Sequence, residues 1–169
     1  KKLIGQILAA SILVFKADVR ITSLYGLFGI EQLPVVVSFL LTIFSILVII
    51  NAFNLIDGIN GLSGSIGTLI CVTLGTWFVL VNQTELAIVA FSLAGAIIAF
   101  LRYNFTPARI FMGDTGALLI GLVCSILAIQ FIETNRLIGP ENEYYFNAVP
   151  AVAIGILILP LYDTLRVFI

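Results

Sequence analysis

Histidine is absent from this chain of 169 residues, and charged residues make up only 10% of it. The missing histidine removes the usual general base and the commonest zinc ligand. Eight basic against nine acidic residues give a net charge of −1, so there is no basic patch for nucleic acid. The two cysteines, Cys71 and Cys124, lie inside apolar runs and are typical of small buried hydrophobic residues. These absences argue against a histidine-based site, a nucleic-acid partner and a disulfide framework.

What the chain has instead is apolar length. Hydrophobic residues make up 61% of it, and its mean hydropathy is +1.20, well outside the soluble globular range. A membrane-spanning helix needs about 20 mostly apolar residues. Five stretches fit this length, at about 34–53, 64–82, 86–102, 115–133 and 147–166. A sixth, at about 3–15, is short, but lysines at its ends can reach the interface. The sequence therefore predicts an all-α polytopic membrane bundle of about six spans.

Alternation of these spans sorts the connections onto two sides. Asp57, Asp114 and Asp163 fall on one side, and the connections 16–33 and 134–146 fall on the other. Five basic residues lie on the aspartate side and three on the opposite side, which favours a cytoplasmic aspartate face. The five are Lys1, Lys2, Arg102, Arg109 and Arg166; the three are Lys16, Arg20 and Arg136.

Two further expectations concern organisation. The chain starts at Lys1 rather than methionine and ends within an apolar-rich stretch, so we expect one membrane domain, 1–169, that is an internal piece of a longer protein. The connection at 19–29 alternates loosely and contains turn glycines, which predicts a small extracytoplasmic hairpin.

A first polar motif, at 51–64, reads NAFNLIDGINGLSG. If the preceding helix continues, Asn51, Asn54 and Asp57 sit three apart and form one polar stripe. Amide and carboxylate oxygens on a stripe can bind a hard cation or the hydroxyls of a sugar or ribose. An ordinary helix end, with Asn and Gly as cap and turn residues, is the alternative. Three glycines would let the backbone approach a ligand closely: Gly58, Gly61 and Gly64.

A second motif, at 111–116, reads FMGDTG and opens a long apolar run. Asp114 could be a simple N-cap. A helix N-terminus also suits phosphate, and a carboxylate beside phosphate requires a divalent cation between them. Magnesium characteristically joins one or two carboxylates to substrate phosphates. The sequence therefore keeps two interpretations of Asp114: an N-cap, or a metal ligand at a phosphate site.

Charged residues near these motifs have similar alternatives. Arg102 and Arg109 can serve as positive-inside anchors or neutralise a diphosphate beside Asp114. Asp163 follows a proline near the end of the last span, and Arg166, three residues on, is its simplest partner.

These residues resemble the polyprenyl-phosphate N-acetylhexosamine-1-phosphate transferase family. It includes the undecaprenyl-phosphate GlcNAc-1-phosphate transferases and the phospho-N-acetylmuramoyl-pentapeptide transferases. Residues 51–64 resemble its Asn-x-x-Asn-x-x-Asp-Gly-x-Asp-Gly-Leu motif, and residues 110–116 resemble its Phe-Met-Gly-Asp-x-Gly motif. Residues 160–164 resemble the segment leading into its final cytoplasmic loop, and residues 2–6 the helix after its Asp-Asp motif.

The resemblance implies a Mg²⁺-dependent enzyme, with Mn²⁺ as a substitute, in the bacterial inner membrane with its active site facing the cytoplasm. It would transfer a sugar-1-phosphate from a UDP-sugar to undecaprenyl phosphate and release UMP, the first membrane step of a cell-envelope polysaccharide. Membrane lipid is the other expected partner, and a homodimer is left open. By resemblance Asp57 and Asp114 are catalytic, and Asp114 and Asn54 hold the metal. The implied substrate-binding residues are Asn51, Asn54, Gly58, Asn60, Gly61, Arg102 and Gly113.

The sequence also departs from the family pattern. Asn60 stands where the family often has Asp, and Ala117 replaces a common Ser. The upstream Asp-Asp pair, implicated in activating the lipid phosphate, and the downstream His-rich loop, implicated in sugar recognition, are missing. The wording of residues 109–116 is closer to the GlcNAc branch, which makes a GlcNAc donor the first choice. An ion-coupled transporter is the alternative, and its polar sites would lie near the middle of the membrane.

Overall fold

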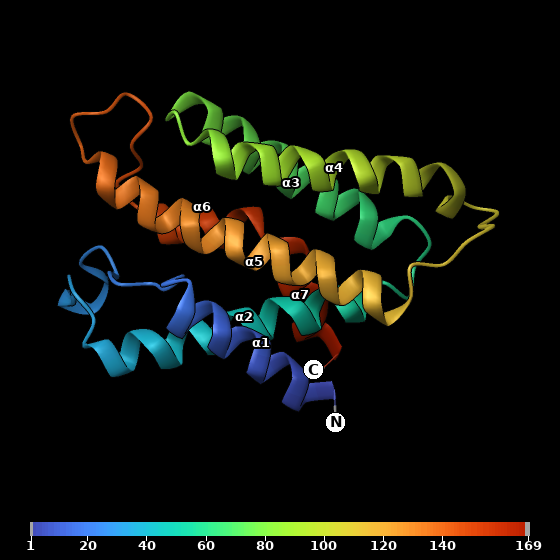
Figure 1. Ribbon diagram of the computed structural model, residues 1–169, viewed down its shortest axis with the longest axis horizontal. Helices are drawn as coiled ribbons and strands as arrows, with labels where there is room; N and C mark the ends of the chain where they lie inside the picture. Colours follow the sequence, from blue (N-terminus) through green and yellow to red (C-terminus); the bar gives the residue numbers. More distant parts are fainter. Residues whose placement is uncertain (1, 168–169) are drawn as a thin grey trace.

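A computed structural model describes residues 2–167 and contains helices with irregular connections (Figure 1). Within these residues the only β-type pairing is an isolated bridge, which confirms the all-α fold. The elements in chain order are α1 (Lys2–Lys16), the short 3₁₀ helix η1 (Leu27–Gly29), α2 (Val35–Ile56), α3 (Leu62–Leu80), α4 (Thr84–Asn104), α5 (Gly113–Ile138), α6 (Val149–Ile156) and α7 (Ile158–Val167).

In the described part of the chain, four helices are long and apolar enough to cross a membrane: α2, α3, α4 and α5. A fifth span results if α6 and α7 are counted together, although they meet at 66°. The expected sixth span, α1, has 15 residues. At a rise of about 1.5 Å per residue, a helix of that length falls short of a hydrocarbon core about 30 Å thick. The predicted bundle is thus confirmed with four or five spans by length and composition.

The expected span at 147–166 is broken rather than continuous. Pro160 has no N–H to donate to the carbonyl of Ile156, and its ring would collide with that carbonyl in a straight helix. The chain bends at Leu157, between α6 and α7, and the amide of Leu161 restarts the helical pattern by donating to the Leu157 carbonyl at 3.2 Å. The proline therefore divides this span into two short helices.

Connections gather at two ends of the bundle (Figure 1). The α2–α3 turn (57–61) and the α4–α5 loop (105–112) lie together at one end, which we call the motif end. The connections 17–34, 81–83 and 139–148 lie at the opposite end. The alternation predicted from the sequence is thereby confirmed for the two motifs. Lys1, counted above with the basic residues, lies outside the described residues.

Close contacts between α2, α3 and α5 fix the helix ends that carry the motifs. The side chain of Phe53 is fully buried between α2, α3 and α5. Gly121 of α5 lies so close to α2 that a Cβ there would come within 2.8 Å of the Cα of Ile50. Small residues permit such close approach between membrane helices. The last turns of α2 are consequently fixed against α5, directly beneath the polar residues of the first motif.

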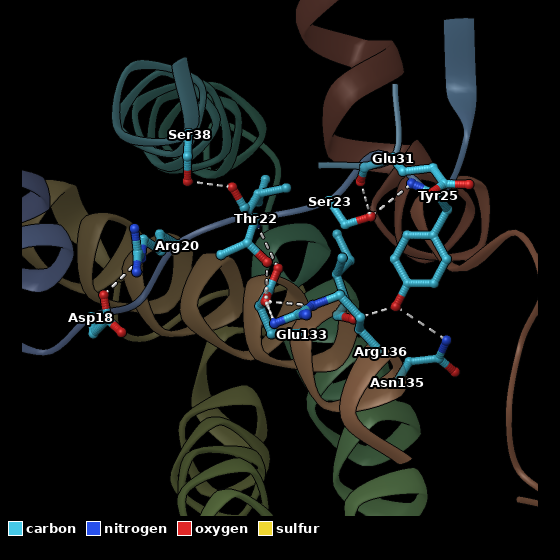
Figure 2. Close-up of polar contacts among 12 residues, drawn as sticks. Asp18, Arg20, Thr22, Ser23, Tyr25, Glu31, Ser38, Glu133, Asn135 and Arg136 are labelled. Atoms are coloured by element: carbon cyan, nitrogen blue, oxygen red, sulfur yellow. Dashed lines mark hydrogen bonds and ion pairs between the residues drawn. The ribbon is translucent and has the colours of Figure 1, made fainter. Parts of the chain in front are cut away.

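The connection between α1 and α2 does not form the hairpin expected at 19–29. Its only bridge pairs Ser23 with Gln32, and Gly26 adopts a left-handed conformation, with φ of 76°, before η1. Figure 2 shows that polar groups of this segment bond to one another and to the neighbouring helices α2 and α5 instead of forming a ladder. The amide and hydroxyl of Thr22 both donate to the Glu133 carboxylate at 2.7 Å.

A tyrosine provides the second attachment of this segment to α5. The hydroxyl of Tyr25 donates to the carbonyl of Ile132 at 2.7 Å and lies 3.3 Å from the amide nitrogen of Asn135 (Figure 2). Burial raises the pKa of Tyr25 to about 12, and the Asn135 hydrogen bond opposes part of that rise. Asn135 also pairs with the backbone of Phe146, so one buried amide joins both long connections at this end.

Candidate functional site

The polar residues at the end of α2 do not act as one stripe. Three residues advance a helix by about 300°, so each member of an i, i+3, i+6 series lags the previous one by about 60°. Asn51 therefore faces α1, where it exchanges hydrogen bonds of 3.3 and 3.4 Å with Gln6. Asn54 faces the starts of both α5 and α1, and Asp57 faces the start of α3. The predicted stripe is divided among three neighbouring helices.

Asn54, Asp114 and Lys2 form a closed triangle of contacts at the motif end. The amide nitrogen of Asn54 donates to Asp114 Oδ1 at 3.0 Å. The Lys2 ammonium donates to Asn54 Oδ1 at 2.8 Å and to Asp114 Oδ2 at 2.9 Å. The Lys2 side chain is 40% exposed and the Asp114 side chain 72% exposed, so the triangle is open to solvent. Three segments far apart in the sequence thus bring a carboxylate, an amide and an ammonium together.

Asp114 is not the N-cap of α5. The residue in that position is Met112, and Asp114 is the second residue of the helix. Gly113 begins the helix in the left-handed region, with φ of 66°, a conformation that favours glycine. A carboxylate in the first helical turn is favoured by the helix dipole. The side chain points across to α1 and α2, where one oxygen accepts from Lys2 and the other from Asn54.

Asp57 is held by the first turn of α3. Ser63, which is 1% exposed, donates its hydroxyl to Asp57 Oδ1 at 2.6 Å. The same hydroxyl oxygen lies 3.6 Å from the sulfur of Met112 in the second motif. Ser63 therefore connects the first motif to the residue two positions before Asp114.

The turn between α2 and α3 is built around Gly61. Its φ is 77°, and its amide donates to the side-chain oxygen of Asn104 at 2.7 Å. A Cβ on Gly61 would lie 2.7 Å from the ring of Phe105. The space beside this glycine is thus taken by an aromatic ring of the α4–α5 loop, and the expected approach of its backbone to a ligand stays a prediction. Gly58 and Asn60, by contrast, are exposed at the surface of the turn.

Asn104 was not among the predicted site residues. It is 5% exposed, and besides accepting from Gly61 it donates to the carbonyl of Ile110 at 2.9 Å. One buried side chain therefore positions both the glycine turn and the loop that leads to Asp114. Arg102 and Arg109 lie on the same side, both exposed, and within residues 2–167 neither has an ion-pair partner.

Asp163 remains apart from the triangle in its contacts. It lies in α7, which packs against α2, and its carboxylate is 4.0 Å from the guanidinium of Arg166. This is the simple partner that the sequence suggested. The structure thus joins Asp114 to Asn54, holds Asp57 nearby through Ser63, and pairs Asp163 within its own helix.

The triangle fits a magnesium ion by its chemistry. Mg²⁺ prefers oxygen ligands, uses one or two carboxylates, and keeps several waters. Asp114 and Asn54 direct oxygens to one point, and that point already holds a cation, the Lys2 ammonium. No group of three or more His, Cys, Asp or Glu side chains clusters within the described part of the chain. A resident metal would therefore depend on these few ligands, water and substrate oxygens.

Three contributors to this end of the molecule escaped sequence analysis: Lys2, Ser63 and Asn104. Lys2 has the appearance of an interfacial anchor, and Ser63 and Asn104 are common polar residues in helix termini. The sequence offers one indication for these residues: they lie within or close to segments that resemble the family. Their roles depend on partners more than 40 residues away for Lys2 and Asn104, which no local pattern records.

Several known proteins resemble this chain. The phospho-N-acetylmuramoyl-pentapeptide-transferase of Moorella thermoacetica is 53% identical over 49 residues, covering 29% of this chain and 15% of that protein. The transferase of the same name from Clostridium perfringens is 43% identical over 65 residues, covering 38% and 20%. That of Rubrobacter xylanophilus is 58% identical over 48 residues, covering 28% and 14%. The matched segments thus span a fifth or less of these relatives.

The match to a whole family is broader. Residues 1–132 match the sequence model of glycosyl transferase family 4, and this stretch contains both motifs and all three members of the triangle. The relatives carry the name of one branch of the family inferred from the two motifs, which confirms that resemblance. With well over half of its length matched, this membrane protein belongs to glycosyl transferase family 4.

Proposed function

We propose that the protein transfers a sugar-1-phosphate from a UDP-sugar to a polyprenyl phosphate at the motif end of its bundle. The observation that carries this proposal is the meeting of Asn54 and Asp114, 3.0 Å apart, at the ends of two membrane helices. A site at helix ends can be reached by a soluble nucleotide from the aqueous side and by a lipid from the bilayer. Membership of glycosyl transferase family 4 supports the same class of reaction.

The residues of the site have separate roles in this proposal. Asp114 and Asn54 hold Mg²⁺, which would offset negative charge between the two phosphates that react. The N-terminus of α5 adds backbone N–H groups and positive dipole beside Asp114. Asp57, fixed by Ser63, binds nucleotide or metal-bound water from the neighbouring turn. Arg102 is exposed at the end of α4 and is available to a phosphate.

A transporter explains the geometry less well. Its coupling-ion site would lie near the middle of the membrane, at breaks within helices. Here Lys2 begins α1, Asn54 lies in the last turn of α2, and Asp114 lies in the first turn of α5. Among residues 2–167 there is one broken span, α6–α7, and it contributes no residue to the triangle.

There are two candidate donors for this reaction. The wording of the second motif favours UDP-GlcNAc, whereas the relatives above are named for phospho-N-acetylmuramoyl-pentapeptide transfer. In the test, the purified natural-length protein is incubated with undecaprenyl phosphate, Mg²⁺ and either UDP-GlcNAc or UDP-N-acetylmuramoyl-pentapeptide, and UMP and lipid-linked product are measured. Release of UMP together with a lipid-linked product identifies the donor. If no UMP is released with either of the two donors, the proposed reaction is overturned.

A further inference from the structure

Lys2 occupies the place where the proposed metal would bind. Its ammonium contacts Asn54 Oδ1 at 2.8 Å and Asp114 Oδ2 at 2.9 Å. These oxygens are the ones assigned to the cation in the proposed function, on which the present inference rests. We propose that Lys2 is a positioning residue: it holds Asn54 and Asp114 together in the metal-free protein and leaves when a divalent cation binds.

Charge and size require the exchange. Mg²⁺ binds oxygens at about 2.0–2.1 Å, so an ion held by both Asn54 Oδ1 and Asp114 Oδ2 would take the space that the Lys2 ammonium now fills. With Lys2 in place, the single negative charge of Asp114 is neutralised. A divalent cation bound by Asp114 would instead leave a net positive site, and Lys2 would be repelled from it. Metal binding must therefore displace the ammonium.

The surroundings of Lys2 allow this movement without rearranging the helices. Lys2 is the first residue of α1, and its side chain is 40% exposed on a flexible four-carbon stem. One turn further on, Gln6 is buried and bonded to Asn51, which fixes α1 against α2 independently. The ammonium can thus swing away while the helix stays in place.

The exchange has a consequence for the order of binding. A displaced ammonium stays close to the site, where a substrate phosphate can accept its hydrogen bonds. Without substrate, metal binding is weakened because Lys2 loses its contacts with Asn54 and Asp114. With an anionic substrate present, the displaced Lys2 bonds to the phosphate instead, so metal binding is not weakened. Lys2 therefore couples the two events, so that the cation is held firmly only when a phosphate is present.

The first experiment measures Mn²⁺ binding to the natural-length protein by electron paramagnetic resonance, without substrate. Removing an exposed competing ion pair should tighten binding severalfold, so Lys2→Met is expected to lower the Kd for Mn²⁺ about threefold to fivefold. Lys2→Arg should keep the natural Kd because it retains the charge. Lys16→Met, at the other end of α1, is the matched control and should have no effect.

A second experiment uses the unaltered protein and so does not depend on a variant folding. The rate at which an N-hydroxysuccinimide ester acylates Lys2 is measured by mass spectrometry with and without Mg²⁺. A freed amine should react severalfold faster once Mg²⁺ is added, while the rate at Lys16 should not change. A Lys2 rate that stays constant at saturating Mg²⁺ would overturn the exchange.

The outcomes separate this inference from the proposed function. If Asp114→Asn abolishes Mn²⁺ binding while Lys2→Met leaves it unchanged or weaker, the metal site stands and the role of Lys2 is a structural one. If Asp114→Asn binds Mn²⁺ as well as the natural protein, the metal site itself is wrong, and the exchange is overturned with it.

Discussion

Asn54 and Asp114 are 60 residues apart in the sequence, yet the amide nitrogen of Asn54 donates to Asp114 Oδ1 at 3.0 Å. The bond joins the last turn of α2 to the first turn of α5, two helices already fixed by the close approach of Gly121 to Ile50. Since both side chains also contact Lys2, each motif supplies one oxygen to a single cation position. The two motifs therefore form one site rather than two.

Replacing Asp114 by Asn should lower the turnover of the natural-length enzyme by about 100-fold or more, as expected when a preorganised electrostatic group is lost. Folding should be retained because the side chain is 72% exposed. UMP release and thermal melting measure the two effects separately. Arg136→Ala, at the opposite end, serves as the control and should change turnover little. Near-normal turnover by the Asp114 variant would remove it from the site.

Replacing Ser63 by Ala should disturb Asp57 without touching a substrate. The carboxylate would lose its 2.6 Å hydrogen bond and its fixed orientation, and kcat/KM should fall on the order of tenfold. Ser65→Ala is the matched control, since Ser65 lies in the same helical turn but is exposed. Equal activity of the two variants would show that Asp57 needs no such support.

Replacing Asn104 by Ala should destabilise the motif end. It would leave the Gly61 amide and the Ile110 carbonyl without their buried partner, at a cost of about 1–3 kcal/mol in unfolding free energy. Thermal melting in detergent is the measurement, with Asn147→Ala, an exposed asparagine of the opposite end, as control. A melting temperature equal to that of the control would contradict a structural role for Asn104.

Alkaline pH should lower the stability of the folded protein, because Tyr25 then loses its proton. Its pKa is raised by burial to about 12, above the value of about 10 for an unfolded tyrosine, so the folded state keeps the proton more strongly. The resulting stabilisation is complete below pH 10 and is lost as the pH rises through 12. Melting curves from pH 8 to 12 should show this decline. Tyr25→Phe should flatten it, whereas Tyr162→Phe, at an exposed position, should not.

Thiol labelling should establish the orientation of the bundle. A cysteine in place of Asn60 should react only from the cytoplasmic side, and one in place of Pro140 only from outside. Both natural cysteines are fully buried, so their background reaction should be low. Labelling of both introduced cysteines by an impermeant reagent in intact cells would reject this topology.

The sequence alone determined the helices and their direction. Long uncharged runs can satisfy their backbone in a membrane only by forming helices, and alternation then places residues 57–61 and 105–112 at the same end. The two motifs were sufficient to indicate the family. By resemblance they also predicted that Asp114 and Asn54 hold one metal; the structure shows these two side chains hydrogen-bonded to each other, and their binding of a metal stays a prediction.

Only the tertiary structure decided which side chains meet. The divergence of Asn51, Asn54 and Asp57 depends on which neighbour stands on each face of α2, and distant segments supply those neighbours. Lys2 joins Asp114 because α1 and α5 pack on the same helix, a relation spanning 112 residues. Local propensity selects helices, but the contacts of a site depend on how those helices are rotated and packed, which long-range side-chain packing sets.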